Sequence, residues 1–117
     1  KKWVKEVIKE LRQQSGLEGF QIFRMLDKEH QKEMMSKLSK SLERPKRKHF
    51  IKANTIANKA ISTKYGYDKM IKKKDMTPDM LIERQSILDD TVNLMAVADK
   101  FGLDVSISKK VYEKYVN

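Results

Sequence analysis

Hydrophobic side chains recur every three or four residues along most of this chain, which is the spacing of one apolar face on an α-helix. The first stripe predicts a helix that ends near Gln14, and Gly16 and Gly19 then predict a connection. A short helical turn over 20–26 should follow, and Asp27 is a good N-cap for the next helix. The first stripe consists of Trp3, Val4, Val7, Ile8 and Leu11. The helix after Asp27 carries Met34, Met35, Leu38 and Leu42 on one side.

The middle of the chain predicts one further helix between two residues that stop helices. Pro45 ends the preceding helix, because the residue before a proline is pushed out of the helical region. The new helix should run from about Lys48 to Lys64, and Gly66 closes it as a left-handed cap. A short basic segment, 67–74, follows.

The last third of the chain predicts a long helix and a short one. Thr77 as N-cap and Pro78 in the first turn begin a helix of about 24 residues, which Gly102 closes. Ser106 or Ser108 caps the final helix. The apolar stripe of the long helix consists of Leu81, Arg84, Leu88, Val92, Met95 and Ala98, widened by Ile87, Thr91 and Leu94.

No stretch shows the sustained alternation of hydrophobic and polar residues that is typical of a strand, so the β content should be near nil. At 117 residues and 39% hydrophobic content, the chain has enough apolar side chains for one modest core. The sequence therefore predicts a single all-α domain over 1–117, a compact bundle of five or six helices without significant β-sheet. No apolar run approaches the roughly 20 residues of a membrane span, so no membrane partner is expected.

Composition narrows the class of protein further. The absence of cysteine excludes a disulfide scaffold, a thiolate zinc site and a cysteine nucleophile, and it fits a reducing compartment. The N-terminal stretch has no apolar signal-peptide core, so a cytoplasmic location is expected. The first residue is Lys instead of Met, which predicts that the chain is a piece of a longer protein.

The positive charge of the chain is concentrated in its middle quarter. Residues 1–43 carry 10 basic and 7 acidic side chains, and residues 44–74 carry 11 basic side chains and 1 acidic one. Residues 75–117 carry 5 basic and 8 acidic side chains, so the middle part alone accounts for the net charge of +10. A local field of this kind attracts a polyanion, and nucleic acid is the first candidate. A lysine-rich surface that is merely solvated is the alternative.

The helix predicted from Lys48 to Lys64 has the composition of a surface that contacts nucleic acid. At about 100° per residue, five polar residues fall within an arc of about 80°, opposite an alanine-rich side. Lysine neutralises phosphates, hydroxyls donate to phosphate oxygens, and Asn54 or Asn58 beside the arc can form two hydrogen bonds with adenine. An ordinary amphipathic helix or a protein-docking face would show the same pattern. The polar residues of the arc are Lys48, Lys52, Thr55, Lys59 and Ser62.

Two basic clusters flank this helix. Loops at both ends of a helix can reach backbone phosphates on either side of a groove, so both clusters belong to the predicted nucleic-acid-binding surface. The clusters are Arg44, Lys46, Arg47 and Lys48 before the helix, and Lys69, Lys72, Lys73 and Lys74 after it.

No pattern in the chain indicates an enzyme, a metal site or a cofactor. His30 and His49 lie far apart in sequence, and neither belongs to a metal-ligand motif. His30 is expected on the surface in the first turn of its helix, and His49 extends the basic segment. Asp89 and Asp90 are adjacent, so on a helix they point about 100° apart and are expected to form its solvent-facing side.

Three stretches, FRMLDKEHQKEMMSKL from Phe23, FIKANTIANKAISTKYGY from Phe50 and DMLIERQSILDDTVNLM from Asp79, resemble parts of a known group of proteins. The group comprises the C-terminal regions of phage and prophage regulatory proteins of the antirepressor type, the Rha and KilA-N group, in Gram-positive bacteria. The resemblance covers most of the chain and implies a cytoplasmic, phage-encoded regulator of transcription whose other domain is missing here. Such regions bind DNA, oligomerise or contact a repressor, so no functional residue is carried over.

Together these observations predict a non-enzymatic nucleic-acid-binding module of a phage-type gene-regulatory protein, with double-stranded DNA preferred to RNA. DNA is preferred because a basic helix suits the major groove, whereas RNA modules more often present aromatic side chains on a sheet. The alternative is a protein-interaction or oligomerisation domain. In that case a repressor, another acidic protein or the acidic third of a second copy would occupy the basic segment.

Overall fold

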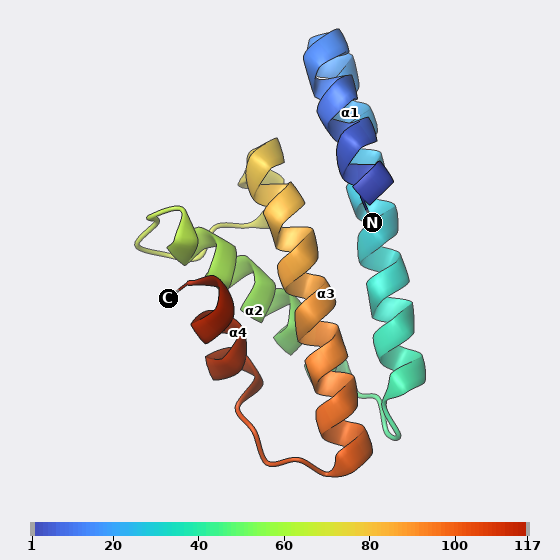
Figure 1. Cartoon of the computed structure of the whole chain (residues 1–117), viewed down its shortest axis with the longest axis vertical. Helices are drawn as coiled ribbons and strands as arrows, with labels where there is room; N and C mark the ends of the chain where they lie inside the picture. Colours follow the sequence, from blue (N-terminus) through green and yellow to red (C-terminus); the bar gives the residue numbers. More distant parts are fainter. Residues whose placement is uncertain (1, 117) are drawn as a thin grey trace.

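The computed structural model describes the backbone of residues 2–116 and the side chains of residues 21–116. The described part is all-α, with four α-helices, one short 3₁₀-helix and no β-strand, which confirms the predicted fold class (Figure 1). The expected five or six helices are too many. None of the described helices is long and apolar enough to cross a membrane. The elements are α1 (Lys2–Ser41), α2 (Arg47–Lys64), η1 (Lys73–Asp75), α3 (Pro78–Phe101) and α4 (Ile107–Tyr115).

A single helix, α1, replaces the two helices and the helical turn that were predicted for the N-terminal third. It continues through Gly16 and Gly19, because a glycine inside a helix costs about 1 kcal/mol but still adopts the helical conformation. Asp27 and His30 therefore lie inside α1 and are buried, so their predicted places as N-cap and surface residue are wrong. The predicted stripe over residues 3–11 lies outside the described side chains.

The other helix ends lie close to their predicted positions. Gly66 follows α2 with a φ of 83° and Gly102 follows α3 with a φ of 60°, a left-handed conformation that glycine adopts without strain. The Thr77 hydroxyl accepts a hydrogen bond from the first turn of α3 at 3.3 Å, and the Ser106 hydroxyl does the same for α4 at 3.4 Å. These helix boundaries are therefore determined by the types of the residues that stand at the helix ends.

Helix α3 forms the centre of the fold, with α1 on one side and α2 and α4 on the other (Figure 1). Its predicted apolar stripe is confirmed, since Leu81, Leu88 and Val92 are fully buried. Helix α2 buries alanines such as Ala53 and Ala57, whose small side chains let it approach α3 closely. The core also contains Phe23, Met34, Leu38, Ile56, Ile61, Ile107 and Val111.

Leu88 has no exposed surface, so its replacement by alanine removes buried methyl groups from the middle of the fold. We expect Leu88→Ala to lower the free energy of unfolding by about 2–5 kcal/mol. Urea denaturation followed by circular dichroism measures this loss. The matched control is Val97→Ala on the same helix, which is 44% exposed and should change stability by at most about 0.5 kcal/mol. Equal effects of the two substitutions would contradict the register of α3.

Candidate nucleic-acid interface

One side of α2 faces solvent and carries most of the basic residues of this helix. Lys48, Lys52, Thr55 and Lys59 are all exposed, as the sequence predicts. Ser62 is only 1% exposed, because the segment after α2 folds back onto it, and its predicted position on the solvent side is wrong. We define the basic face of α2 by its exposed residues Arg47, Lys48, Ile51, Lys52, Thr55, Lys59 and Thr63.

The first turn of α2 combines a helix N-terminus with several positive charges. Lys46 is the N-cap residue, Arg47 and Lys48 follow it, and the turn contains no acidic residue. The backbone N–H of Lys46 donates to Nδ1 of His49 at 3.0 Å. Cations at a helix N-terminus oppose the helix dipole, each by about 0.3–1 kcal/mol, whereas an anion is favoured there. The stability of the fold therefore does not explain the positive charges of this turn.

Most cations of the 44–74 segment have no carboxylate partner in the described part of the chain. Of its 11 basic residues, only Lys64 and Lys73 form ion pairs with described residues, with Glu83 and Asp27 respectively, each at 2.8 Å. Exposed cations without carboxylate partners sum to a field that attracts phosphate groups, and one of them, Lys59, lies 5.9 Å from the centre of the Tyr112 ring. The nine other basic residues are Arg44, Lys46, Arg47, Lys48, Lys52, Lys59, Lys69, Lys72 and Lys74.

These nine cations lie along the whole length of α2 and at both of its ends. Arg44 and Lys46 precede the helix, and Lys69, Lys72 and Lys74 lie between α2 and α3. With 18 residues, α2 is about 27 Å long. A DNA double helix carries one charge per about 1.7 Å of its axis, so a duplex presents several phosphates over a distance equal to the length of α2.

Three side chains tie the C-terminal end of α2 to α3. The Lys64 ammonium binds the Glu83 carboxylate at 2.8 Å, and the Tyr65 hydroxyl donates to the other carboxylate oxygen. Partial burial raises the pKa of Glu83, but these two hydrogen bonds outweigh it and hold the pKa below its usual value. The hydrogen bond to Glu83, together with burial, raises the pKa of Tyr65 to about 12. Glu83 is therefore ionised at neutral pH and keeps Lys64 engaged.

Asn54 and Asn58 lie at the edge of the basic face of α2, where they bind a buried arginine of α3. Arg84 is 2% exposed and donates from Nε to Asn58 Oδ1 at 2.6 Å and from one terminal nitrogen to Asn54 Oδ1 at 3.0 Å. Its other terminal nitrogen donates to Gln31 Oε1 of α1 at 2.9 Å. Burial lowers the pKa of Arg84, and the carboxylate of Asp27 acts in the opposite direction. Both asparagines therefore position α2, and their oxygens are already occupied.

Asp27 is the carboxylate of this buried network. It is 2% exposed, accepts a hydrogen bond from Gln85 Nε2 at 2.9 Å and pairs with the Lys73 ammonium at 2.8 Å. Arg24, one turn earlier on α1, donates to three backbone carbonyls within residues 73–76. These contacts fix η1 against α1 and take Lys73 out of the predicted basic cluster.

The acidic residues in the middle of α3 bind the neighbouring helices. Asp89 Oδ1 lies 2.7 Å from Nε2 of His30 on α1, and Asp90 binds the Lys114 ammonium of α4 at 2.6 Å. Partial burial raises the pKa of Asp90, but hydrogen bonds from Lys114 and Tyr115 outweigh it and hold the pKa below its usual value. Asp89 and Asp90 are 34% and 37% exposed, so the prediction that they form a solvent-facing side is right only in part, because both also bind neighbouring helices.

The polar network around Arg84 is the part of the site that sequence reasoning missed. Its signal was an arginine within an otherwise apolar stripe, which implies a buried cation that needs oxygen partners from neighbouring helices. Among the described residues, no group of three histidine, aspartate or glutamate side chains is placed to hold a metal ion. Comparison with known protein families, curated proteins and solved structures gives no match to this chain.

Proposed function

We propose that this chain is a non-enzymatic nucleic-acid-binding module, with DNA preferred to RNA, of a phage-type gene-regulatory protein. The observation that carries the proposal is the set of nine basic residues without a carboxylate partner in the described part, several of them at the N-terminus of α2. These cations oppose the helix dipole and one another, so they cost stability in the free protein. A row of phosphates relieves both costs.

The residue types of the basic face support contacts with the DNA backbone more than with the bases. Lysine, arginine and threonine side chains contact phosphates, and these contacts carry no sequence information by themselves. Asn54 and Asn58 bind Arg84, so a contact of either with adenine is no part of this proposal. We therefore propose binding with little sequence preference along the basic face of α2.

The affinity for duplex DNA should depend steeply on salt. Each phosphate contact contributes about −0.9 to the slope of log K against log salt concentration. With five to seven of the nine cations in contact at once, we expect a slope of roughly −4 to −6. Binding should then weaken ~300- to 4,000-fold for a fourfold rise in salt. Fluorescence anisotropy with a labelled random-sequence duplex at several salt concentrations measures this slope.

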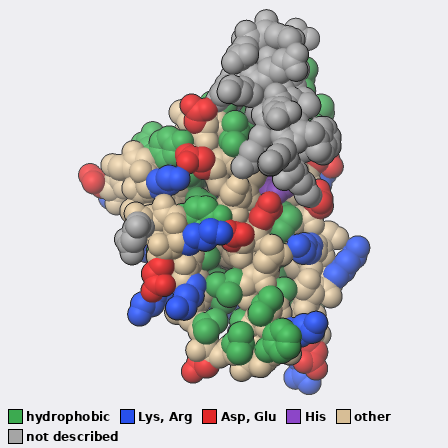
Figure 2. Space-filling model, in the orientation of Figure 1, with side chains coloured by type: hydrophobic (Ala, Val, Ile, Leu, Met, Phe, Trp, Pro, Cys, Tyr) green, Lys and Arg blue, Asp and Glu red, His purple; other side chains and the backbone are tan. Residues whose placement is uncertain are grey.

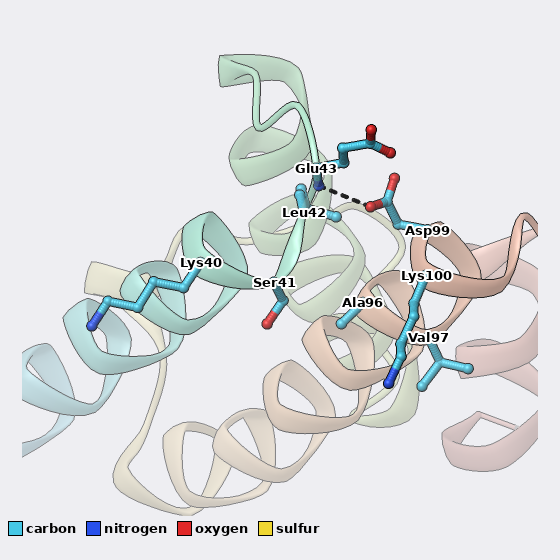
Figure 3. Close-up of a pocket in the computed structure, with 8 residues that line it drawn as sticks. All are labelled: Lys40, Ser41, Leu42, Glu43, Ala96, Val97, Asp99 and Lys100. Carbon is cyan, nitrogen blue, oxygen red and sulfur yellow. Dashed lines mark hydrogen bonds between the residues drawn. The ribbon is translucent and has the colours of Figure 1, made fainter.

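A protein-interaction or oligomerisation role is the second candidate, and an exposed apolar cluster favours it. Figure 2 shows hydrophobic side chains gathered in its lower part, where α3 ends. Phe101 is 65% exposed, and Val97 borders an open cavity of about 460 Å³ between the ends of α1 and α3. In this cavity Asp99 accepts the backbone N–H of Glu43 at 3.0 Å (Figure 3). The exposed cluster consists of Val97, Phe101, Leu103 and Val105.

The salt dependence of DNA binding and the size of the protein in solution distinguish nucleic-acid binding from protein interaction. Three of the eight acidic residues in the last third, Glu83, Asp89 and Asp90, already bind groups within their own chain, which weakens the case for binding of a second copy to the basic face. Size-exclusion chromatography with light scattering detects association through the apolar cluster. A salt slope shallower than about −2, together with a stable dimer at physiological salt, would favour the interaction role over nucleic-acid binding.

A further inference from the structure

The segment between α2 and η1 forms a loop that closes on a single buried residue. The backbone carbonyl of Ser62 accepts the N–H of Tyr67 at 3.0 Å, and the Ser62 hydroxyl accepts the N–H of Ile71, also at 3.0 Å. The same hydroxyl donates to the carbonyl of Asn58 at 2.7 Å, so its position is fixed within α2. We call residues 67–71 the Ser62 loop. It projects from the side of the fold, away from α1 (Figure 1).

The Ser62 loop presents apolar and cationic side chains to solvent together. Tyr67 is 45% exposed and Met70 is 47% exposed, although both are large hydrophobic residues. Asp68 and Lys69 lie between them and are both exposed, Lys72 follows the loop, and neither lysine pairs with a described carboxylate. Ile71 turns inward and packs against the core, so the loop is anchored at its C-terminal end as well. Burial of the core therefore does not require Tyr67 or Met70.

We propose that the Ser62 loop binds unpaired nucleotides, with a base stacked on the Tyr67 ring and the adjoining phosphates at Lys69 and Lys72. An aromatic ring beside cations is the combination that single-strand-binding surfaces use, because every base has a face that stacks. The two hydrogen bonds to Ser62 hold the loop closed in the free protein, which lowers the entropic cost of binding. This inference rests on the proposed nucleic-acid binding and extends it to single-stranded regions.

The position of the loop separates its ligand from that of the basic face. The loop follows the C-terminal end of α2, whereas the cations that oppose the helix dipole lie at the N-terminal end. A chain with both surfaces would bind a duplex along α2 and an unpaired strand beyond its end. Tyr65, whose hydroxyl is bound to Glu83, is not part of the proposed stacking surface.

The experiment compares Tyr67→Ala, Tyr67→Phe and the unchanged chain on two probes, single-stranded oligothymidine and a random-sequence duplex. We expect Tyr67→Ala to weaken binding of the single strand by roughly 5- to 150-fold, as for the loss of one stacked base. Tyr67→Phe keeps the ring and should stay within about twofold of the unchanged chain. Duplex affinity should be the same for all three proteins. Circular dichroism confirms that the variants remain folded.

The outcomes distinguish this inference from the proposed function. Binding of the duplex without binding of oligothymidine, or equal losses on both probes with Tyr67→Ala, would overturn the inference and leave the proposed function standing. Loss of single-strand binding with Tyr67→Phe as well would overturn stacking as its cause. Binding of neither probe would overturn the proposed function and the inference together. Tyr67-dependent binding to anionic lipid vesicles in place of nucleic acid would assign the loop to a membrane surface and also overturn it.

Discussion

Reversal of charge at Lys48, Lys52 and Lys59 to glutamate should weaken binding of duplex DNA by at least about 500-fold at about 0.1 M salt. At this concentration each phosphate contact accounts for a factor of about 8 in affinity, so the loss of three contacts alone gives this figure. The fold should persist, because all three side chains are exposed and a glutamate at position 48 lies in the first turn of α2, where the helix dipole favours it. Fluorescence anisotropy measures the affinity, and circular dichroism checks the helix content.

The matched control reverses Lys28, Lys40 and Lys109, which are exposed, lie outside the basic segment and have no ion pair with a described residue. Both triple variants lower the net charge by the same amount, so a difference in their affinity for DNA depends on where the charges lie on the protein. We expect the control variant to bind duplex DNA tens of times more tightly than the α2 variant. If both triple variants lose affinity equally, attraction is diffuse and α2 has no dedicated binding surface.

Replacement of Asp27 by asparagine should be the most destabilising conservative substitution in the polar network. It removes the buried carboxylate that pairs with Lys73 and favours the charged form of Arg84. Loss of one partner from a buried ionic group costs about 3–5 kcal/mol, because the remaining charge stays buried without compensation. Urea denaturation at neutral pH measures the change in the free energy of unfolding. A change below about 1 kcal/mol would show that other groups balance the charge of Arg84.

The control for this substitution is Asp104→Asn. Asp104 is exposed in the loop between α3 and α4 and forms no ion pair with a described residue. Its replacement also removes one negative charge, but it should change stability by at most about 0.5 kcal/mol. The comparison separates the effect of burial from the effect of net charge.

Features that depend on neighbouring residues were predictable from the sequence, and features that depend on distant ones were not. The caps at Thr77, Gly102 and Ser106 act within a single turn, so their residue types identify them. The connection predicted at the two glycines of α1 is wrong, because glycine weakens a helix without ending it. Asp27 resembled an N-cap because nothing near it in sequence indicates its partner, a lysine 46 positions further along the chain.

The candidate site shows the same division. The helical period placed Lys48, Lys52 and Lys59 correctly on the exposed side of α2. It also placed Ser62 on this side of α2. Ser62 is nevertheless buried, because the Ser62 loop covers it. Asn54 and Asn58 lie at the edge of the exposed arc, where the sequence cannot tell solvent from a neighbouring helix. Arg84, 26 residues beyond Asn58, decides their environment.

The central position of α3 has a consequence for how the protein is made. On the ribosome, α1 and α2 emerge before α3, and in the finished fold they meet mainly through it (Figure 1). Until Arg84 has emerged, the side-chain oxygens of Gln31, Asn54 and Asn58 lack the guanidinium that they bind in the finished fold, and the apolar sides of the first two helices lack their shared surface. We therefore expect the basic face of α2 to reach its final place in the fold only after α3 has been synthesised.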